Sequence, residues 1–182
     1  MDYQQISTLM DAAEIRTILT RVTDEILERG GAKELALVGI RTRGVPLAKR
    51  LADLIQTRTG TDLPLGVLDI TLYRDDLTDI ASQPVVRPTV LPFPVDGHRI
   101  VLVDDVLYTG RTVRAAIDQL IDFGRPRKIE LMVLIDRGWR ELPFKADYVG
   151  KEVETTKQQM VEVRLDENDG RDEVVLMEQK QP

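Results

Sequence analysis

Apolar residues recur along the chain in two alternating patterns: continuous runs of strand length, and residues spaced three and four apart. The clearest continuous runs span residues 35–40, 100–103 and 129–135. Helical spacing occupies residues 15–26, 47–55 and 113–121. Continuous apolar runs are typical of strands buried on both faces of a sheet, and the spaced residues are typical of amphipathic helices. Their alternation predicts an α/β fold, with a mainly parallel twisted sheet and helices on both faces.

Capping residues and glycines mark where the helices begin and end. Asp11 stands three residues before Glu14, a capping box that predicts the start of the first helix, and Gly30-Gly31 predicts its end. Pro46 fits the first turn of the second helix. The residues expected to face inward from the third helix are Val113, Ile117, Leu120 and Ile121.

Shorter segments complete the predicted architecture. Residues 67–73 read as a further strand, and small strands are expected at 160–165 and 174–177. The segment 74–94 has no periodicity and holds four prolines. A structureless stretch of about 20 residues in a compact domain is typical of a functional flap or a disordered loop. The chain shows no repeat and no long linker, so we expect one domain over residues 1–182.

Composition excludes several classes of site. The 182 residues include no cysteine, which excludes disulfides, thiolate nucleophiles and cysteine metal sites. The single His98 excludes a histidine-rich metal site. No stretch approaches the roughly 18 apolar residues of a membrane span, and the first ten residues lack the pattern of a signal peptide. A net charge of −6 argues against general nucleic-acid affinity but leaves room for one basic face. We therefore expect a cytoplasmic protein.

Three of the predicted strands end in polar loops, at residues 41–44, 104–112 and 136–138. Ligands of parallel α/β sheets bind beyond the carboxyl ends of the strands. These loops therefore predict the position of the site.

The segment IVLVDDVLYTGRT, residues 100–112, carries the sharpest chemical signal. Four apolar residues lead to Asp104 and Asp105, and the turn 109–112 then enters a helix, where backbone N–H groups and the helix dipole favour a phosphate. Carboxylates beside a phosphate cradle suit a ribose phosphate. Neither GxxxxGK[ST] nor GxGxxG occurs. The alternative is a capped turn with a solvated acidic pair.

This segment resembles the phosphoribosyl-pyrophosphate (PRPP) motif of the type I phosphoribosyltransferases. With it, GIRTRGVPLAKRLA, LDITLYRDDL and DRGWRELPFKADYVGK resemble the bacterial family of pyrimidine operon regulatory proteins, PyrR, over nearly the whole chain. The resemblance implies a uracil phosphoribosyltransferase that forms UMP and pyrophosphate. It also implies UMP-dependent binding of pyr mRNA in transcription attenuation, and a homo-oligomer, dimer or tetramer.

The resemblance also assigns residues. Asp104 and Asp105 would hold the ribose hydroxyls with Mg2+ nearby. Residues 41–44 would form the pyrophosphate loop, in which relatives often have a cis peptide. Arg74 would lie at the start of the flap that closes over PRPP, and Arg137 would line the side of the site that holds the base and the pyrophosphate. The residues implied around PRPP and UMP are Arg41, Thr42, Arg43, Gly44, Asp104, Asp105, Val106, Leu107, Tyr108, Thr109, Gly110, Arg111, Thr112, Arg137 and, for the base, Val161.

The resemblance to the RNA-binding face is incomplete. The residues at matching positions are Thr20, Arg21, Arg29 and Arg140. Asp24 and Trp139, however, replace the histidines of the family pattern. Basic and acidic residues are equally numerous between residues 14 and 33: Arg16, Arg21, Arg29 and Lys33 against Glu14, Asp24, Glu25 and Glu28. A neutral surface gains little free energy from counterion release.

Three alternatives stay open. The protein is a nucleotide-sensing RNA regulator with vestigial catalysis, a transferase that has lost RNA binding, or a transferase for a purine or orotate. Relatives that act on purines tend to have an acid where this chain has Tyr108, so Tyr108 favours a pyrimidine.

Overall fold

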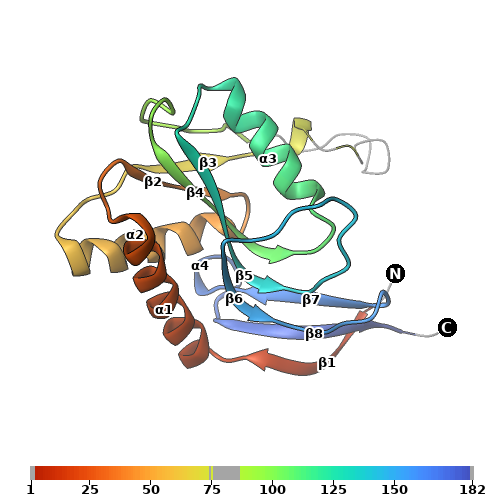
Figure 1. The fold of residues 1–182 in the computed structure, drawn as a ribbon. Helices are drawn as coiled ribbons and strands as arrows, with labels where there is room; N and C mark the ends of the chain where they lie inside the picture. Colours follow the sequence, from red (N-terminus) through yellow and green to blue (C-terminus); the bar gives the residue numbers. More distant parts are fainter. Residues whose placement is uncertain (1–2, 74, 76–86, 181–182) are drawn as a thin grey trace.

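Five parallel strands form the central sheet, in the order β3-β2-β4-β5-β6 (Figure 1). Their bounds are Leu35–Ile40 for β2, Leu65–Leu68 for β3, Arg99–Leu107 for β4, Lys128–Asp136 for β5 and Tyr148–Glu152 for β6. The computed structural model describes residues 3–73, 75 and 87–180. No helix in these ranges combines the length and apolar character that crossing a bilayer requires.

Helices cover both faces of this sheet. α1 (Ala12–Gly30) and α2 (Gly44–Thr59) lie on one face, and α3 (Arg111–Asp122) lies on the other (Figure 1). Val101 and Val103 pack in the core with α1 and α2, whereas the alternate residues Ile100 and Leu102 pack in the core with α3. The predicted α/β fold is therefore confirmed, because β4 buries both of its faces.

The helix boundaries agree with the capping signals. Asp11 accepts from the backbone N–H of Glu14 at 2.8 Å, and the Glu14 carboxylate accepts from the N–H of Asp11 at 2.9 Å, so the capping box is present. One inward residue was predicted wrongly, since Ile121 is 55% exposed. It lies in the last turn of α3 next to the buried Leu120, on a side of the helix that is turned toward solvent.

A second, antiparallel sheet of three strands has the order β1-β8-β7. β7 (Gln159–Arg164) and β8 (Glu173–Gln179) confirm the predicted small strands, and the single turn α4 (Asp166–Asp169) joins them. β1 (Tyr3–Met10) was not predicted, because its residues are mostly polar and exposed. It is held by pairing with β8, at the other end of the chain, which a local pattern does not reveal.

The strand predicted at residues 67–73 was wrong in its bounds. β3 ends at Leu68, and residues Thr71–Tyr73 form a 3-10 turn. The carboxylate of Asp69 accepts from the backbone N–H of Thr71 at 3.0 Å and also from its hydroxyl, which turns the chain away from the sheet. β6 was missed as well, because only its first two residues are apolar.

Most of the predicted flap, including Arg74, lies outside the described residues. Its last part, residues 87–94, lies beside β3, because Val90 and Val67 form an antiparallel bridge with N–O distances of 2.8 and 2.9 Å. The end of this segment is therefore tied to the central sheet.

A buried ionic cluster lies at the amino ends of the strands, opposite the carboxyl ends that carry the polar loops. Arg99 and Glu130 are 4% and 1% exposed and form an ion pair, and the Tyr148 hydroxyl donates to Glu130 at 3.1 Å. Arg99 also donates to the carbonyls of Ile26 and Gly31, so it caps the end of α1. Burial alone raises the pKa of Glu130, but the hydrogen bonds from Arg99, Lys128 and Tyr148 together with the charge of Arg99 lower the pKa overall.

Glu130→Ala should lower the free energy of unfolding by about 3–5 kcal/mol, because it leaves the Arg99 guanidinium buried without its counter-charge. Glu34→Ala is the matched control. Its ion pair with Arg127 is about half exposed, so its loss should cost under about 1 kcal/mol. Urea denaturation of both variants measures the difference. Equal losses would show that the buried pair has no special weight.

Candidate functional site

Three neighbouring cavities lie at the carboxyl ends of the strands, where the three polar loops meet. One of ≈ 410 Å³ is lined by residues that include Arg41, Thr42, Asp104 and Asp105. A second of ≈ 340 Å³ follows residues 106–113, and a third of ≈ 730 Å³ includes residues 136–140. Val106 and Thr112 line both the first and the second, so these two cavities adjoin.

The two acids lie within β4, which continues past them to Leu107. Asp104 is 6% exposed and Asp105 is half-buried. One Asp104 oxygen accepts from the N–H of Asp105 at 2.9 Å, and one Asp105 oxygen accepts from the N–H of Val106 at 2.8 Å. Burial, together with the charge of Asp105, raises the pKa of Asp104 well above its usual range. The pair therefore forms a site where a cation or hydroxyl donors are favoured.

The turn after β4 is shaped to expose backbone amides at the start of α3. Gly110 is the N-cap with φ +92°, and a Cβ there would lie 3.0 Å from the Phe144 ring. The carbonyl of Thr109 accepts from the N–H groups of Glu141 and Leu142, which fixes the turn. Arg111 forms ion pairs with Glu141 and Asp75 at its rim. The helix N-terminus thus offers a site for an anion.

The loop 41–44 approaches β4 closely. A Cβ at Gly44 would lie 2.2 Å from the carbonyl oxygen of Val103, so only glycine lets α2 begin here. The peptide bond between Arg41 and Thr42 is cis, as the resemblance implied. Arg41 Nη2 donates to the carbonyl of Pro88 at 3.3 Å, while its buried Nε has no hydrogen-bond partner among the described residues. An unpartnered buried donor is rare and indicates a missing acceptor.

Asp69, Thr71 and Arg87 line the same cavity as the two acids, although the sequence did not single them out. The Asp69 carboxylate accepts from the backbone N–H groups of Thr71 and Arg87, at 3.0 and 2.6 Å. Burial alone raises the pKa of Asp69, but the hydrogen bonds from Thr71 and Arg87 lower it overall. The signal available in the sequence was a single acid at the end of an apolar run, in LGVLDI.

Arg137 and Tyr108 join the second and third cavities. The guanidinium carbon of Arg137 stacks 4.1 Å from the centre of the Tyr108 ring. Arg137 Nη2 donates to the carbonyl of Thr156 at 3.1 Å, and burial lowers the pKa of Arg137. Trp139 is 44% exposed, and its Nε1 donates to the carbonyl of Thr155 at 2.8 Å.

Three residues expected around the ligand, Val161, Arg43 and Gly44, are not among the residues that line these cavities. Val161 is in β7, 6% exposed, where its side chain belongs to the core and its backbone pairs with Leu176 of β8. Arg43 is the N-cap of α2, and its guanidinium is bound by Asp169 of α4, whose hydrogen bond raises the pKa of Arg43.

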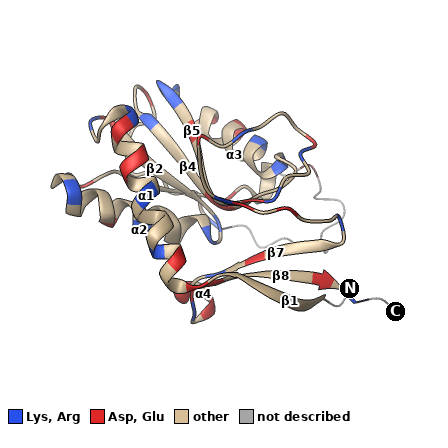
Figure 2. Ribbon diagram, turned by 60° about the horizontal axis from the view of Figure 1, so that its bottom comes forward, with Lys and Arg blue, Asp and Glu red and all other residues tan. Residues whose placement is uncertain are grey.

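The residues expected to contact RNA are separate from the cavities, except for Arg140. Thr20, Arg21 and Arg29 lie on α1, where Figure 2 shows basic and acidic residues interspersed. Arg21 donates to the carbonyls of Val149 and Gly150 at 3.0 and 2.7 Å. Arg140 donates to the carbonyl of Tyr108 at 2.7 Å and forms an ion pair with Asp136, which fixes the turn after β4. Asp24 forms an ion pair with Arg58 of α2.

Comparison with known proteins agrees with this geometry. The family model of the phosphoribosyl transferase domain matches residues 5–168. Proteins named bifunctional protein PyrR are 60% identical in Pelotomaculum thermopropionicum, over 93% of this chain and 94% of the relative, and 56% identical in Deinococcus radiodurans, over 94% of each. A crystal structure of a hypoxanthine phosphoribosyltransferase from Staphylococcus aureus shares the fold, with a TM-score of 0.69, 18% identity, and coverage of 98% of this chain and 94% of that one. The chain belongs to the PyrR family of phosphoribosyltransferase-domain proteins.

Proposed function

We propose that the protein transfers the phosphoribosyl group of PRPP to uracil, forming UMP and pyrophosphate. The observation that carries this proposal is the buried acidic pair of β4, which runs directly into an anion-binding turn and lines one cavity with the 41–44 loop. A ribose that carries phosphates at C5 and C1 needs these three features side by side. The family relationship supports the same reaction.

The binding roles follow from the chemistry of each group. The carboxylates of Asp104 and Asp105 accept from the ribose hydroxyls. The amides of residues 109–112 and the hydroxyls of Thr109 and Thr112 bind the 5′-phosphate, where the helix dipole of α3 favours negative charge. Arg41 and Thr42 line the same cavity as the acids and are placed to bind the pyrophosphate group.

The residues fit an Mg2+ ion that arrives with PRPP. The described residues contain no group of three or more side chains suited to hold a metal, but Asp104 and Asp105 supply two carboxylates. Mg2+ commonly binds one or two protein carboxylates together with substrate phosphates. When bound, the ion would offset the negative charge of the pyrophosphate.

Catalysis in this site depends on charge and alignment. The bond from C1 to the pyrophosphate oxygen breaks while the bond from C1 to uracil N1 forms, through a transition state with oxocarbenium character. Arg41 and, with the flap closed, Arg74 neutralise the departing pyrophosphate, and Arg43 contributes from the start of α2. The Tyr108–Arg137 stack borders the space beside C1 and suits a small planar base such as uracil. Val161 of β7 is assigned to the base through its backbone.

A UMP-formation assay with uracil, PRPP and Mg2+ tests this function, with hypoxanthine, guanine and orotate in parallel. We expect turnover with uracil alone, because Tyr108 stands where purine enzymes tend to place an acid. Turnover with a purine or orotate instead would change the assigned base. Binding of UMP without turnover of any base would favour a nucleotide-sensing regulator with vestigial catalysis.

Replacement of both acids, Asp104→Asn with Asp105→Asn, should abolish this turnover. The charge that holds the ribose and the cation is removed, while the side chains keep their size. Circular dichroism should show an intact fold, since the side chains of both apolar clusters are left unchanged. A double variant with normal turnover would contradict the assignment.

Asp104→Asn alone should stabilise the ligand-free protein at neutral pH. Burial raises the pKa of Asp104 above its value in the unfolded chain, so the wild type is most stable below the unfolded pKa and loses this contribution as pH rises through the folded pKa. The variant should gain about 1 kcal/mol, or roughly 2–4 °C in Tm, near pH 7 and nothing near pH 3. Thermal denaturation across pH measures this; a pH-independent difference would contradict it.

We also propose the setting in which the enzyme acts. The chain forms one phosphoribosyltransferase domain over residues 1–182, assembles into a homo-oligomer (dimer or tetramer), and works in the cytoplasm. Its relatives are named bifunctional, and the second function proposed here is UMP-dependent binding of pyr mRNA to control transcription attenuation. Thr20, Arg21 and Arg29 on α1, with Arg140, are the proposed contacts. The ion pair with Arg58 offsets the repulsion that Asp24 would exert on an RNA phosphate.

Asp24→His should raise the affinity for pyr mRNA at low salt, because it removes a negative charge from α1 and releases the Arg58 guanidinium. The gain in affinity should vanish at high salt, because salt screens the interaction between the RNA phosphates and the changed charge on α1. A filter-binding titration across salt concentrations measures it. Asp118→His is the matched control, since its ion pair with Arg114 lies on α3, across the sheet. Equal affinities for Asp24→His and wild type at every salt concentration would contradict an RNA site on α1.

A further inference from the structure

The loop between β7 and β8 is attached to α2 by two arginines: Arg43, which is the N-cap of the helix, and Arg50 within it. Arg50 donates to both oxygens of Glu167, at 2.8 and 2.6 Å, and to both oxygens of Asp172, at 2.8 and 2.7 Å. Arg43, two helical turns earlier, donates through Nε and Nη2 to the two oxygens of Asp169, at 3.1 and 2.8 Å. The small sheet is thereby held against the start of the helix that follows the 41–44 loop.

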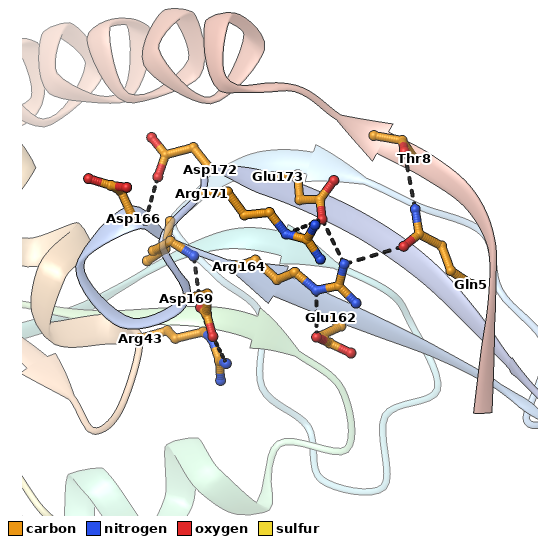
Figure 3. Close-up of polar contacts among 11 residues, drawn as sticks. Gln5, Thr8, Arg43, Glu162, Arg164, Asp166, Asp169, Arg171, Asp172 and Glu173 are labelled. Atoms are coloured by element: carbon orange, nitrogen blue, oxygen red, sulfur yellow. Dashed lines mark hydrogen bonds and ion pairs between the residues drawn. The ribbon is translucent and has the colours of Figure 1, made fainter. Parts of the chain in front are cut away.

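The two attachments differ in what they control. The four hydrogen bonds of Arg50 already fix the β7–β8 loop to the second turn of α2. The Arg43–Asp169 pair adds little to that attachment, but it determines where the Arg43 guanidinium lies. Figure 3 shows the Asp169 carboxylate between the Arg43 guanidinium and the backbone of the β7–β8 loop. Its Oδ2 also accepts from the N–H of Leu165 at 2.9 Å, so the carboxylate is itself oriented before it binds the arginine.

A guanidinium that is paired through Nε and one terminal nitrogen can still bind an anion through the other terminal nitrogen. The pair with Asp169 uses Nε and Nη2 and leaves Nη1 outside the pair. The guanidinium is not part of the cavity wall, but it lies close enough to the site for the charge of Asp105 to raise the pKa of Arg43. A long arginine side chain otherwise loses roughly 2 kcal/mol of rotamer entropy when it is fixed. Because the pair with Asp169 already holds the half-buried Arg43 side chain, part of this entropy is lost before the substrate binds.

We infer that Asp169 is a positioning residue for the pyrophosphate end of PRPP, which it serves by holding Arg43 with Nη1 available to the substrate. This inference rests on the proposed function, which places Arg43 in the pyrophosphate loop. The same pair connects that loop to the sheet of β7, to which the base is assigned.

Direct binding of PRPP and of UMP, with Mg2+, tests the inference in Asp169→Asn by calorimetry. UMP has the ribose, the 5′-phosphate and the base but lacks the pyrophosphate. We expect PRPP to bind about tenfold more weakly, a loss smaller than the full rotamer entropy of one arginine. UMP should bind within about twofold of wild type. Asp172→Asn, which removes a carboxylate of the same loop that pairs with Arg50, should leave both affinities within about twofold.

A double-mutant comparison separates action through Arg43 from a general effect on the loop. In an Arg43→Gln background, Asp169→Asn should weaken PRPP binding no further, because the guanidinium that it positions is absent. Three results would overturn the inference: an unchanged or tighter affinity for PRPP, an equal loss for PRPP and UMP, or an additive loss in the double variant. A wild-type protein that binds neither PRPP nor UMP would refute the proposed function instead.

Discussion

β4 is hydrogen-bonded along both of its edges, to β2 and to β5, and the position of the whole site depends on this pairing. A central parallel strand has fixed ends, and its carboxyl end here delivers two acids, the turn and the start of α3 in succession. The close approach at Gly44 brings the 41–44 loop to the same end. Arg41 and Asp104, which are 63 residues apart in sequence, therefore line one cavity.

The charges of the site are arranged at a cost to stability. Asp104 is nearly buried beside a second carboxylate, and Arg41 Nε is buried without a partner among the described residues. Both would be unfavourable in a purely structural core, where polar groups are paired. At a site for a charged substrate the acids are useful, because the bound substrate and its cation supply partners for the two carboxylates.

Among the described residues, arginine side chains make most of the side-chain hydrogen bonds that join segments distant in sequence. Arg99 joins the end of α1 to β5, Arg140 fixes the turn after β4, and Arg43 with Arg50 attaches the small sheet to α2. A planar guanidinium can bind two acceptors with fixed geometry. The abundance of charge in the chain thus reflects internal contacts as well as a solvated surface, and this limits what net charge reveals about partners.

The sequence by itself determined the elements whose signals are local. The capping box at Asp11, the apolar run before Asp104 and the glycine at 110 each specify one turn or strand, and the order of strands and helices specified the α/β class. Only the tertiary structure decided β1, the bounds of β3 and the partners of Asp69 and Asp169. These features arise from pairing between distant segments, and residue spacing along the chain carries no record of such contacts.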